Sequence, residues 1–392
     1  MTSHISSQPP RVPLLSEALL KGHECYFEID TRFRRAARLL QALWLKDHNI
    51  ATGFHVRQNE AGDTVMPLSS VLSAEAARAG RNFLTADIHA AVRRELLMRE
   101  IGACYDEERL FGNALSSGPL TMNLLIPLAQ DLDLATAVFR RLLPDVIHQV
   151  LAVRFETAPL PRRDPAGLED GTAFDAAIDA VDPDGVPITC FIEIKYSEDM
   201  CGPAARLRET YDIRSREVRL FIDPDSPTLR NLGLEQLWRE AMLAQIAVDR
   251  GCTPRAHFMA IGPRLNRRVQ VAFQNFANEL IPADDQDPDR IGFTSLTLES
   301  FIEAIRDCGN VELANALWQR YADFGRVFDY ALDWIDQQAR ATDQAFPIEA
   351  ELAPLVHRDR RAPVVRSPGR TNGSRRREKP DAGGQTKRDV SA

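Results

Sequence analysis

Residues 172–196, TAFDAAIDAVDPDGVPITCFIEIKY, place two apolar stretches on either side of a turn signal. The tetrapeptide Asp182-Pro183-Asp184-Gly185 has proline at its second position and glycine at its fourth, a pattern typical of a tight β-turn. Residues 172–181 alternate loosely between apolar and polar side chains, whereas residues 186–196 are almost continuously apolar. Strand, turn and strand therefore predict an antiparallel hairpin whose second strand is buried.

The expected register of this hairpin brings charged side chains together. With the turn centred on Pro183-Asp184 and one extra residue at Gly185, Asp175 lies opposite Glu193. Glu193 and Lys195 share a face because the side chains of a strand alternate. Unpaired carboxylates in a buried strand pair cost free energy, so we expect a hard divalent cation, Mg²⁺ or Mn²⁺, to compensate them.

Such a site predicts phosphodiester chemistry. A divalent cation polarises a phosphodiester, lowers the pKa of a bound water and stabilises the charge that builds on phosphorus. Lys195 could position or deprotonate that water, or neutralise the transition-state charge. The backbone carbonyl of Ile194 is a further candidate metal ligand. The alternative interpretation is a solvated ladder of charges on a surface hairpin.

Lysine usage also draws attention to this strand. Of the 48 basic residues only five are lysines, and Lys195 is the only one between Lys46 and Lys379. Arginine is a rigid planar cation, whereas lysine is a compact point charge whose pKa a site can tune. A single interior lysine in an arginine-rich chain therefore favours a specific role for Lys195.

Periodic patterns predict the elements around the hairpin. Before it, amphipathic patterns predict helices at residues 31–48 and 85–101, and the first half of the chain is expected to be helical. Residues 115–143 are expected to form two or three short helices, divided by Pro119 and Pro127 and ended by Pro144. The other predicted elements are a strand at 149–156, a helix at 234–248, a strand at 256–261, a helix at 266–280 and a helical region at 301–340. Beyond Leu355 the chain is rich in Pro, Gly and Arg, and we expect it to be disordered.

Asp175, a 17-residue interval and Glu193-Ile194-Lys195 together resemble the motif of the PD-(D/E)xK nuclease superfamily, with Phe174 where many members have proline. The predicted order of elements, from the helix before Pro144 to the strand at 256–261, is similar to the αβββαβ core of its restriction-endonuclease-like fold. The resemblance implies an α/β protein with a mixed central sheet, flanked by N- and C-terminal helices.

Two further segments are similar to an uncharacterised bacterial branch of that superfamily with restriction-related members. They are Asn113-Ala114-Leu115-Ser116-Ser117 with Met122-Asn123-Leu124, and Lys195-Tyr196-Ser197-Glu198-Asp199. Gly118 stands where that branch is expected to have Gln.

The resemblance also implies roles for individual residues. Asp175 and Glu193 would bind the metal, and Lys195 would be the catalytic lysine. Many members have an additional upstream acidic residue, for which the first candidate is Glu156 at the end of the first strand, ahead of Glu108 and Glu95.

The helix predicted at residues 234–248 offers one more candidate. Gln236 could contact the site or the phosphate. A solvated helix face is the favoured interpretation for Gln236 and Arg239.

Other chemistries lack their motifs. Ser116-Ser117 is not part of a GxSxG elbow and is expected to cap or pack a helix. None of the six cysteines is spaced as CxxC, none of the eight histidines as HxxxH, and no GxxxxGK[ST] motif occurs. The sequence therefore does not favour a zinc hydrolase, a redox pair or autonomous ATP hydrolysis.

Charge is unevenly distributed along the chain. The net charge is −8, yet residues 357–392 have eleven basic and four acidic side chains. The acidic remainder is not expected to bind nucleic acid by bulk charge, although the basic tail could add attraction for DNA. No apolar run predicts a membrane span and the N-terminus does not resemble a secretory signal, so a cytoplasmic protein is expected.

We predict three regions: a helical N-terminal region (1–145) that includes the first core helix, a nuclease core with C-terminal helices (146–345), and a basic disordered tail (346–392). The predicted function is Mg²⁺-dependent hydrolysis of DNA by a PD-(D/E)xK endonuclease. The candidate partners are a second copy of the chain, as a homodimer, and a partner protein that delivers the DNA. The alternative is a non-catalytic module of the same fold that binds nucleic acid or protein. Sequence specificity, DNA against RNA, and endo- against exonucleolytic cleavage stay open.

Overall fold

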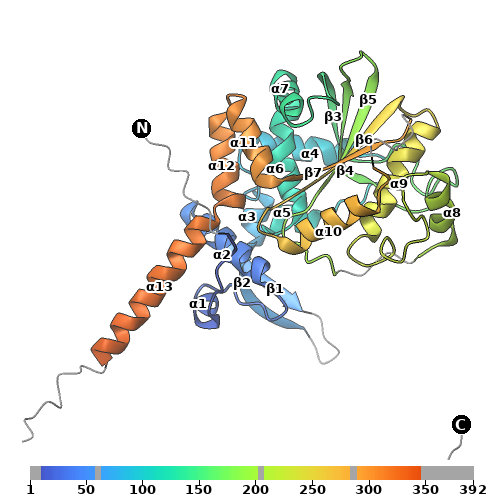
Figure 1. Ribbon diagram of the computed structural model, residues 1–392. Helices are drawn as coiled ribbons and strands as arrows, with labels where there is room; N and C mark the ends of the chain where they lie inside the picture. The colour runs from blue at the N-terminus through green and yellow to red at the C-terminus, as the bar shows by residue number, and fades with distance from the viewer. Residues whose placement is uncertain (1–9, 58–62, 202–206, 283–288, 346–392) are drawn as a thin grey trace, which may run out of the picture. The chain divides into compact units, whose positions relative to one another are not determined.

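A five-stranded mixed sheet with strand order β3-β4-β5-β6-β7 organises the structure (Figure 1). The first three strands form an antiparallel meander, β6 pairs in parallel with β5, and β7 pairs in parallel with β6. The strands are β3 (Gln149–Thr157), β4 (Phe174–Val181), β5 (Pro187–Ile194), β6 (Arg255–Gly262) and β7 (Gly292–Thr297). With α7 (Leu132–Leu142) before β3 and α9 (Glu235–Asp249) before β6, the predicted αβββαβ order is confirmed.

This computed structural model describes residues 10–57, 63–201, 207–282 and 289–345. The described residues up to Arg340 belong to one compact unit. The tail beyond Leu355, predicted to be disordered, lies outside the described residues.

The turn between β4 and β5 sets the register of the hairpin. Gly185 has a φ of +82°, a conformation that glycine adopts without a steric cost, and its N–H donates to the Asp182 carbonyl at 3.0 Å. The Asp182 carboxylate accepts from the backbone N–H of Asp184 (2.9 Å) and of Val186 (2.8 Å). Ala176 consequently pairs with Ile192, so Asp175 and Glu193 follow as the next residues outward, as predicted.

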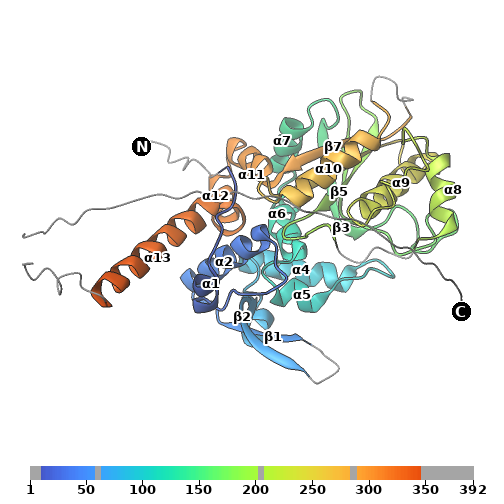
Figure 2. The same cartoon turned by 60° about the horizontal axis from the view of Figure 1, so that its bottom comes forward.

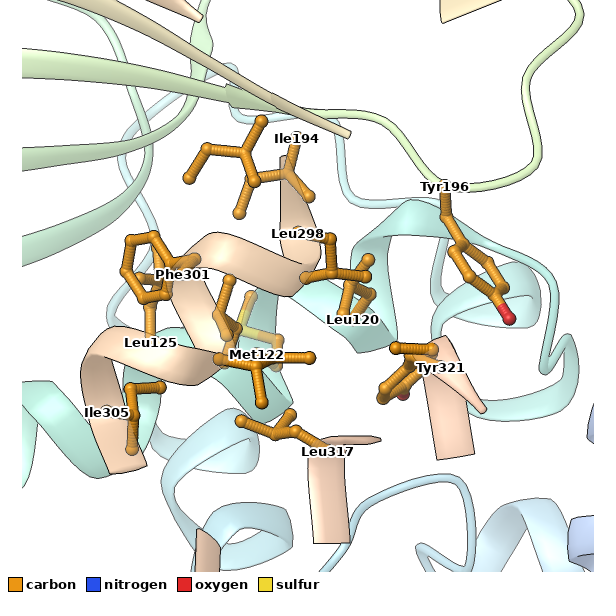
Figure 3. Close-up of a cluster of buried hydrophobic side chains, with 14 of the residues drawn as sticks. Leu120, Met122, Leu125, Ile194, Tyr196, Leu298, Phe301, Ile305, Leu317 and Tyr321 are labelled. Carbon is orange, nitrogen blue, oxygen red and sulfur yellow. The ribbon is translucent and has the colours of Figure 1, made fainter. Parts of the chain in front are cut away.

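Helices cover both faces of the sheet (Figure 1). On one face, Ile194 lies in a hydrophobic cluster with side chains of α6 (Ser117–Gln130) and α11 (Leu298–Asp307) (Figure 3). Ile192 and side chains of α7 belong to the same cluster. On the other face, Phe191 packs in a second cluster with α8 (Glu209–Glu217), α9 and α10 (Arg267–Glu279). Because strand side chains alternate, Glu193 and Lys195 lie on the same side of the sheet as α9.

The prediction that the first half of the chain is helical was wrong at one place. A separate two-stranded antiparallel ribbon, β1 (Thr52–Arg57) and β2 (Thr64–Leu72), lies beside α2 and apart from the main sheet (Figure 2). The remaining N-terminal helices are α1 (Glu17–Gly22), α2 (Arg32–Asp47), α3 (Ala74–Arg78), α4 (Ala86–Met98) and α5 (Glu107–Gly112). The helices predicted at residues 31–48 and 85–101 are confirmed by α2 and α4.

Two prolines do not divide α6 as predicted. Pro119 lies in the first turn, where the missing N–H has no intrahelical acceptor to lose, and Pro127 lies inside the helix. Helix α6 ends at Gln130 instead, because Asp131 caps the next helix by accepting from the backbone N–H of Leu134 at 2.9 Å.

The C-terminal region is helical, as predicted. It consists of α11, α12 (Val311–Leu317), a π-helical turn η2 (Trp318–Ala322) and α13 (Phe324–Ala345). Neither β7 nor α8 was predicted from the sequence.

Candidate active site

Glu193 and Lys195 form the centre of the site at the C-terminal end of β5. The two residues are only 4% and 7% exposed, and the Lys195 Nζ lies 2.5 Å from the Glu193 Oε1. Both side chains also bond Gln236 of α9: its Oε1 accepts from Lys195 Nζ at 2.8 Å, and its Nε2 donates to Glu193 Oε1 at 2.8 Å. The three side chains therefore form a closed ring of hydrogen bonds. Both bonds to Glu193 in this ring are accepted by its Oε1, and neither involves its Oε2.

Glu240 extends this ring by one helical turn. Its Oε1 accepts from Gln236 Nε2 at 2.7 Å, and the residue is 1% exposed. Its second oxygen, Oε2, is buried without a hydrogen-bond partner in the described part of the chain. Burial, reinforced by the charge of Glu193, raises the pKa of Glu240 well above its usual value.

The interpretation of Gln236 and Arg239 as a solvated helix face was wrong. Arg239 is largely buried and contacts Glu235 (Nε to Oε1, 2.5 Å), Asp170 (Nη1 to Oδ2, 3.3 Å) and Thr172. Sequence reasoning also missed Glu240, although its position four residues after Gln236 places the two on one helix face.

Asp175 reaches the same end of the sheet from β4. Its Oδ2 accepts from the backbone N–H of Ile194 at 2.7 Å, so the carboxylate occupies the space where β4 pairing with β5 ends. Burial and the charge of Glu193 raise the pKa of Asp175 well above its usual value, whereas Lys195 acts in the opposite direction. Asp175 and Glu193 thus lie close enough for their charges to interact, as the hairpin register predicts.

Glu156 approaches the site from β3. Its backbone has a φ of +42°, its carboxylate lies 3.3 Å from the Arg162 guanidinium, and its carbonyl accepts from Arg162 Nη2 at 2.8 Å. Burial raises the pKa of Glu156, and the charge of Glu193 acts in the same direction. The predicted upstream residue therefore lies within electrostatic reach of the other carboxylates.

Two cavities adjoin these groups. A cavity of about 410 Å³ is lined by Glu156, Gln236 and Glu240, among others. A smaller one of about 100 Å³ is lined by Glu156 and Asp175, among others. Glu156 lines both cavities, and neither of the other upstream candidates, Glu108 and Glu95, lines either of them.

The donor set fits a hard divalent cation. Asp175 and Glu193 supply carboxylate oxygens at neighbouring strand ends, the ligand type that Mg²⁺ and Mn²⁺ prefer. Burial and the charge of Glu193 raise the pKa of Asp175, and a cation bound there would offset both effects. Among the described residues, however, no group of three or more His, Cys, Asp or Glu side chains is already arranged as a metal site. The Ile194 carbonyl stays a predicted ligand.

Ser116 caps α6, accepting from the backbone N–H of Gly118 at 3.3 Å, as expected of a cap and not of a nucleophile. All six cysteines are free thiols. In the parts of the chain that the structure covers, no helix is both long enough and apolar enough to span a membrane.

Comparison with known proteins places these residues in a family. The family model described as the PD-(D/E)XK nuclease superfamily matches residues 28–323, which is most of the chain and includes Glu156, Asp175, Glu193, Lys195, Gln236 and Glu240. No curated protein and no solved structure matches the chain. The chain belongs to the PD-(D/E)XK nuclease superfamily, and its mixed sheet agrees with the restriction-endonuclease-like fold. Nucleases of this superfamily generally use divalent metal ions, and their substrate class is nucleic acid.

Proposed function

We propose that this member of the superfamily is a Mg²⁺- or Mn²⁺-dependent endodeoxyribonuclease. The observation that supports the proposal most is the buried Lys195, held 2.5 Å from Glu193 beside the Asp175 carboxylate. A lysine and two carboxylates in this arrangement suit a reaction that builds negative charge on a phosphoryl group.

Asp175, Glu193 and the Ile194 carbonyl would hold the metal, with Glu156 as an additional acidic residue. The bound ion would polarise the phosphodiester and lower the pKa of the attacking water. The hydrogen bond from the Ile194 N–H orients Asp175, and Lys195 with Gln236 orients Glu193. These bonds fix the carboxylates before substrate arrives, which limits the reorganisation needed during the reaction.

Lys195 would act as a cation and not as a base. Burial by itself lowers the pKa of Lys195, but the charges of Glu193 and Glu240 more than offset this, so its pKa lies above the usual value. A protonated Lys195 could donate a hydrogen bond to the water or to a phosphoryl oxygen. We therefore assign it electrostatic stabilisation of the transition state.

DNA binding would depend on local contacts. The net charge of −8 opposes non-specific attraction of the whole chain to DNA. A partner protein that delivers the substrate, or a second copy of the chain, would supply the missing attraction. A cytoplasmic location agrees with these assignments and is part of the proposal.

The experiment compares cleavage of a supercoiled plasmid and of a labelled single strand by purified protein in Mg²⁺, Mn²⁺ and EDTA. The variants are Asp175→Ala and Lys195→Ala, with Asp179→Ala as a matched control. Asp179 also lies on β4, but it pairs with Arg154 at 2.8 Å. Metal-dependent nicking that is lost in both test variants and kept in the control is the expected result.

Two other results would overturn parts of the proposal. Full activity of Lys195→Ala would remove the role assigned to Lys195. DNA binding without cleavage in any metal would instead support the alternative, a non-catalytic module that uses this fold to bind nucleic acid or a partner.

A further inference from the structure

A buried carboxyl group without a full set of partners lies next to the proposed site. Glu240 is 1% exposed on α9, and only its Oε1 accepts a hydrogen bond in the described structure. Leaving Oε2 unpaired costs free energy, because the oxygen lost its contacts with water when the chain folded. A carboxyl group kept at such a cost needs an explanation other than packing.

The Gln236 amide gives that explanation. Its Nε2 donates to both Glu193 and Glu240, and its Oε1 accepts from Lys195. Both amide hydrogens therefore face carboxylates. A flip of the amide would turn its oxygen towards Glu193 and Glu240 and its hydrogens towards the Lys195 ammonium, so the second carboxylate makes the flipped orientation less favourable.

We propose that Glu240 is a positioning residue: its Oε1 fixes the orientation of the Gln236 amide, and the amide in turn holds Lys195 against Glu193. This inference rests on the nuclease function proposed above and adds a residue to its supporting structure. Glu240 acts through Gln236 and does not contact the substrate.

A neighbouring glutamate on the same helix shows what an ordinary structural carboxylate looks like. Both oxygens of Glu235 contact Arg239, at 2.5 and 3.4 Å, so its charge is paired. Within the described parts of the chain, Glu240 forms no ion pair with an arginine and bonds only an amide that itself bonds Lys195 and Glu193. A purely structural position of this kind would be filled better by methionine, which has a similar volume and no oxygen to satisfy.

The test uses near-isosteric substitutions in the full chain. Glu240→Met removes the acceptor, and we expect kcat for metal-dependent cleavage to fall roughly 10- to 100-fold, the usual effect of losing an orienting partner. We expect KM to stay within about twofold and the urea midpoint of unfolding to stay constant or rise. Glu240→Gln keeps a carbonyl acceptor and should restore most of kcat.

Gln245→Met is the matched control. Gln245 is also buried on α9, but it bonds Ile291 and Asp249 away from the site. This variant should lower the urea midpoint and leave kcat unchanged, which is the opposite of the pattern expected for Glu240→Met.

A double variant tests the route through Gln236. If Glu240 acts through the amide, Glu240→Met should not slow Gln236→Leu any further. Three results would overturn the proposal: an additive loss in the double variant, equal losses in Glu240→Gln and Glu240→Met, or a loss of kcat that only follows the loss of folded protein.

Failure of the nuclease proposal itself would be recognised separately, as absence of cleavage by the unmodified chain. In that case the urea midpoints decide. A midpoint shift by Glu240→Met that differs between the unmodified chain and the Gln236→Leu background supports the coupling, and an equal shift in both backgrounds overturns it.

Discussion

Lys195 and Arg320 are both buried cations, and the protein compensates their charges in different ways. Lys195 lies among carboxylates, bonded to Glu193 and near Glu240. Arg320, in the π-helical turn η2, is 0% exposed and donates to neutral oxygens of Asn82 and Gln41.

Aromatic rings complete the surroundings of Arg320. Its guanidinium lies over the rings of Trp44 and Tyr321, with 4.3 and 5.0 Å to the two ring centroids. Burial lowers the pKa of Arg320, because its neutral partners compensate the charge less fully than carboxylates would. In line with the proposed function, we expect the Lys195 cluster to serve catalysis and the Arg320 cluster to stabilise the fold.

One residue joins the two clusters. The hydroxyl of Tyr196, which follows Lys195 directly, accepts from Gln41 Nε2 at 3.0 Å, and the same Nε2 donates to the Arg320 carbonyl at 2.6 Å. The strength of this link can be measured.

The largest expected effect is on catalysis. Lys195→Met should lower the rate of plasmid nicking by roughly 10²- to 10³-fold, because the charge that stabilises the transition state is lost. Rates are compared at equal concentrations of folded protein, judged by circular dichroism. A variant within about threefold of the unmodified chain would contradict the assignment of chemistry to this cluster.

Arg320→Met should lower stability and leave activity nearly unchanged, the opposite of the result expected for Lys195→Met. Three acceptor contacts, two to Asn82 and one to Gln41, lose their donor, so we expect the free energy of unfolding to fall by about 3 kcal/mol in urea titrations. Nicking per folded molecule should change by no more than about threefold. An unchanged urea midpoint would show that Arg320 does not support the structure as described.

The dependence of stability on pH separates the clusters further. Because the pKa of Asp175 is raised in the folded state, the folded protein binds the Asp175 proton more tightly than the unfolded chain does. The stabilisation of the folded state by this proton is present below the ordinary pKa of 3.8 and is lost as the pH rises through the raised value. In EDTA, Asp175→Asn should therefore gain stability relative to the unmodified chain as the pH increases from about 4 towards 8.

Asp179→Asn serves as the control for this pH series, since Asp179 pairs with Arg154 on the same strand. Urea midpoints at several pH values measure both differences. A stability difference that does not change with pH in Asp175→Asn would contradict the raised pKa of Asp175 in the folded state.

The smallest effect is expected at the link between the clusters. Tyr196→Phe removes one hydrogen bond, and we expect the free energy of unfolding to fall by about 1 kcal/mol. Nicking should stay within about twofold. A much larger loss of activity would show that the two clusters act as one unit.

Sequence could predict the hairpin because its determinants are local. The turn residues and Gly185 lie next to one another, and they set the register that places Asp175 beside Glu193. The sequence patterns of the ribbon β1–β2, of β7 and of α8 were too weak to be recognised beside the neighbouring helical patterns.

The supporting residues of the site depend on contacts that no local pattern shows. Gln236 and Glu240 are shielded from solvent because α9 packs on the sheet face that holds Glu193, a contact between distant segments of the chain. Arg320 likewise contacts Trp44, which is distant in the sequence. A motif can identify groups that do chemistry, but the groups that orient them are found from the packing of one element on another.

The scarcity of lysine has a practical consequence for following the conformation of this protein. Between Lys46, which is exposed, and Lys379, the chain offers a lysine-specific protease one cutting site, Lys195, and that side chain is 7% exposed. Digestion there requires the end of β5 to open, so the appearance of the two fragments would report local unfolding at the centre of the site. Limited digestion with a lysine-specific protease can therefore follow opening of the site in the unmodified protein, without a label or an engineered residue.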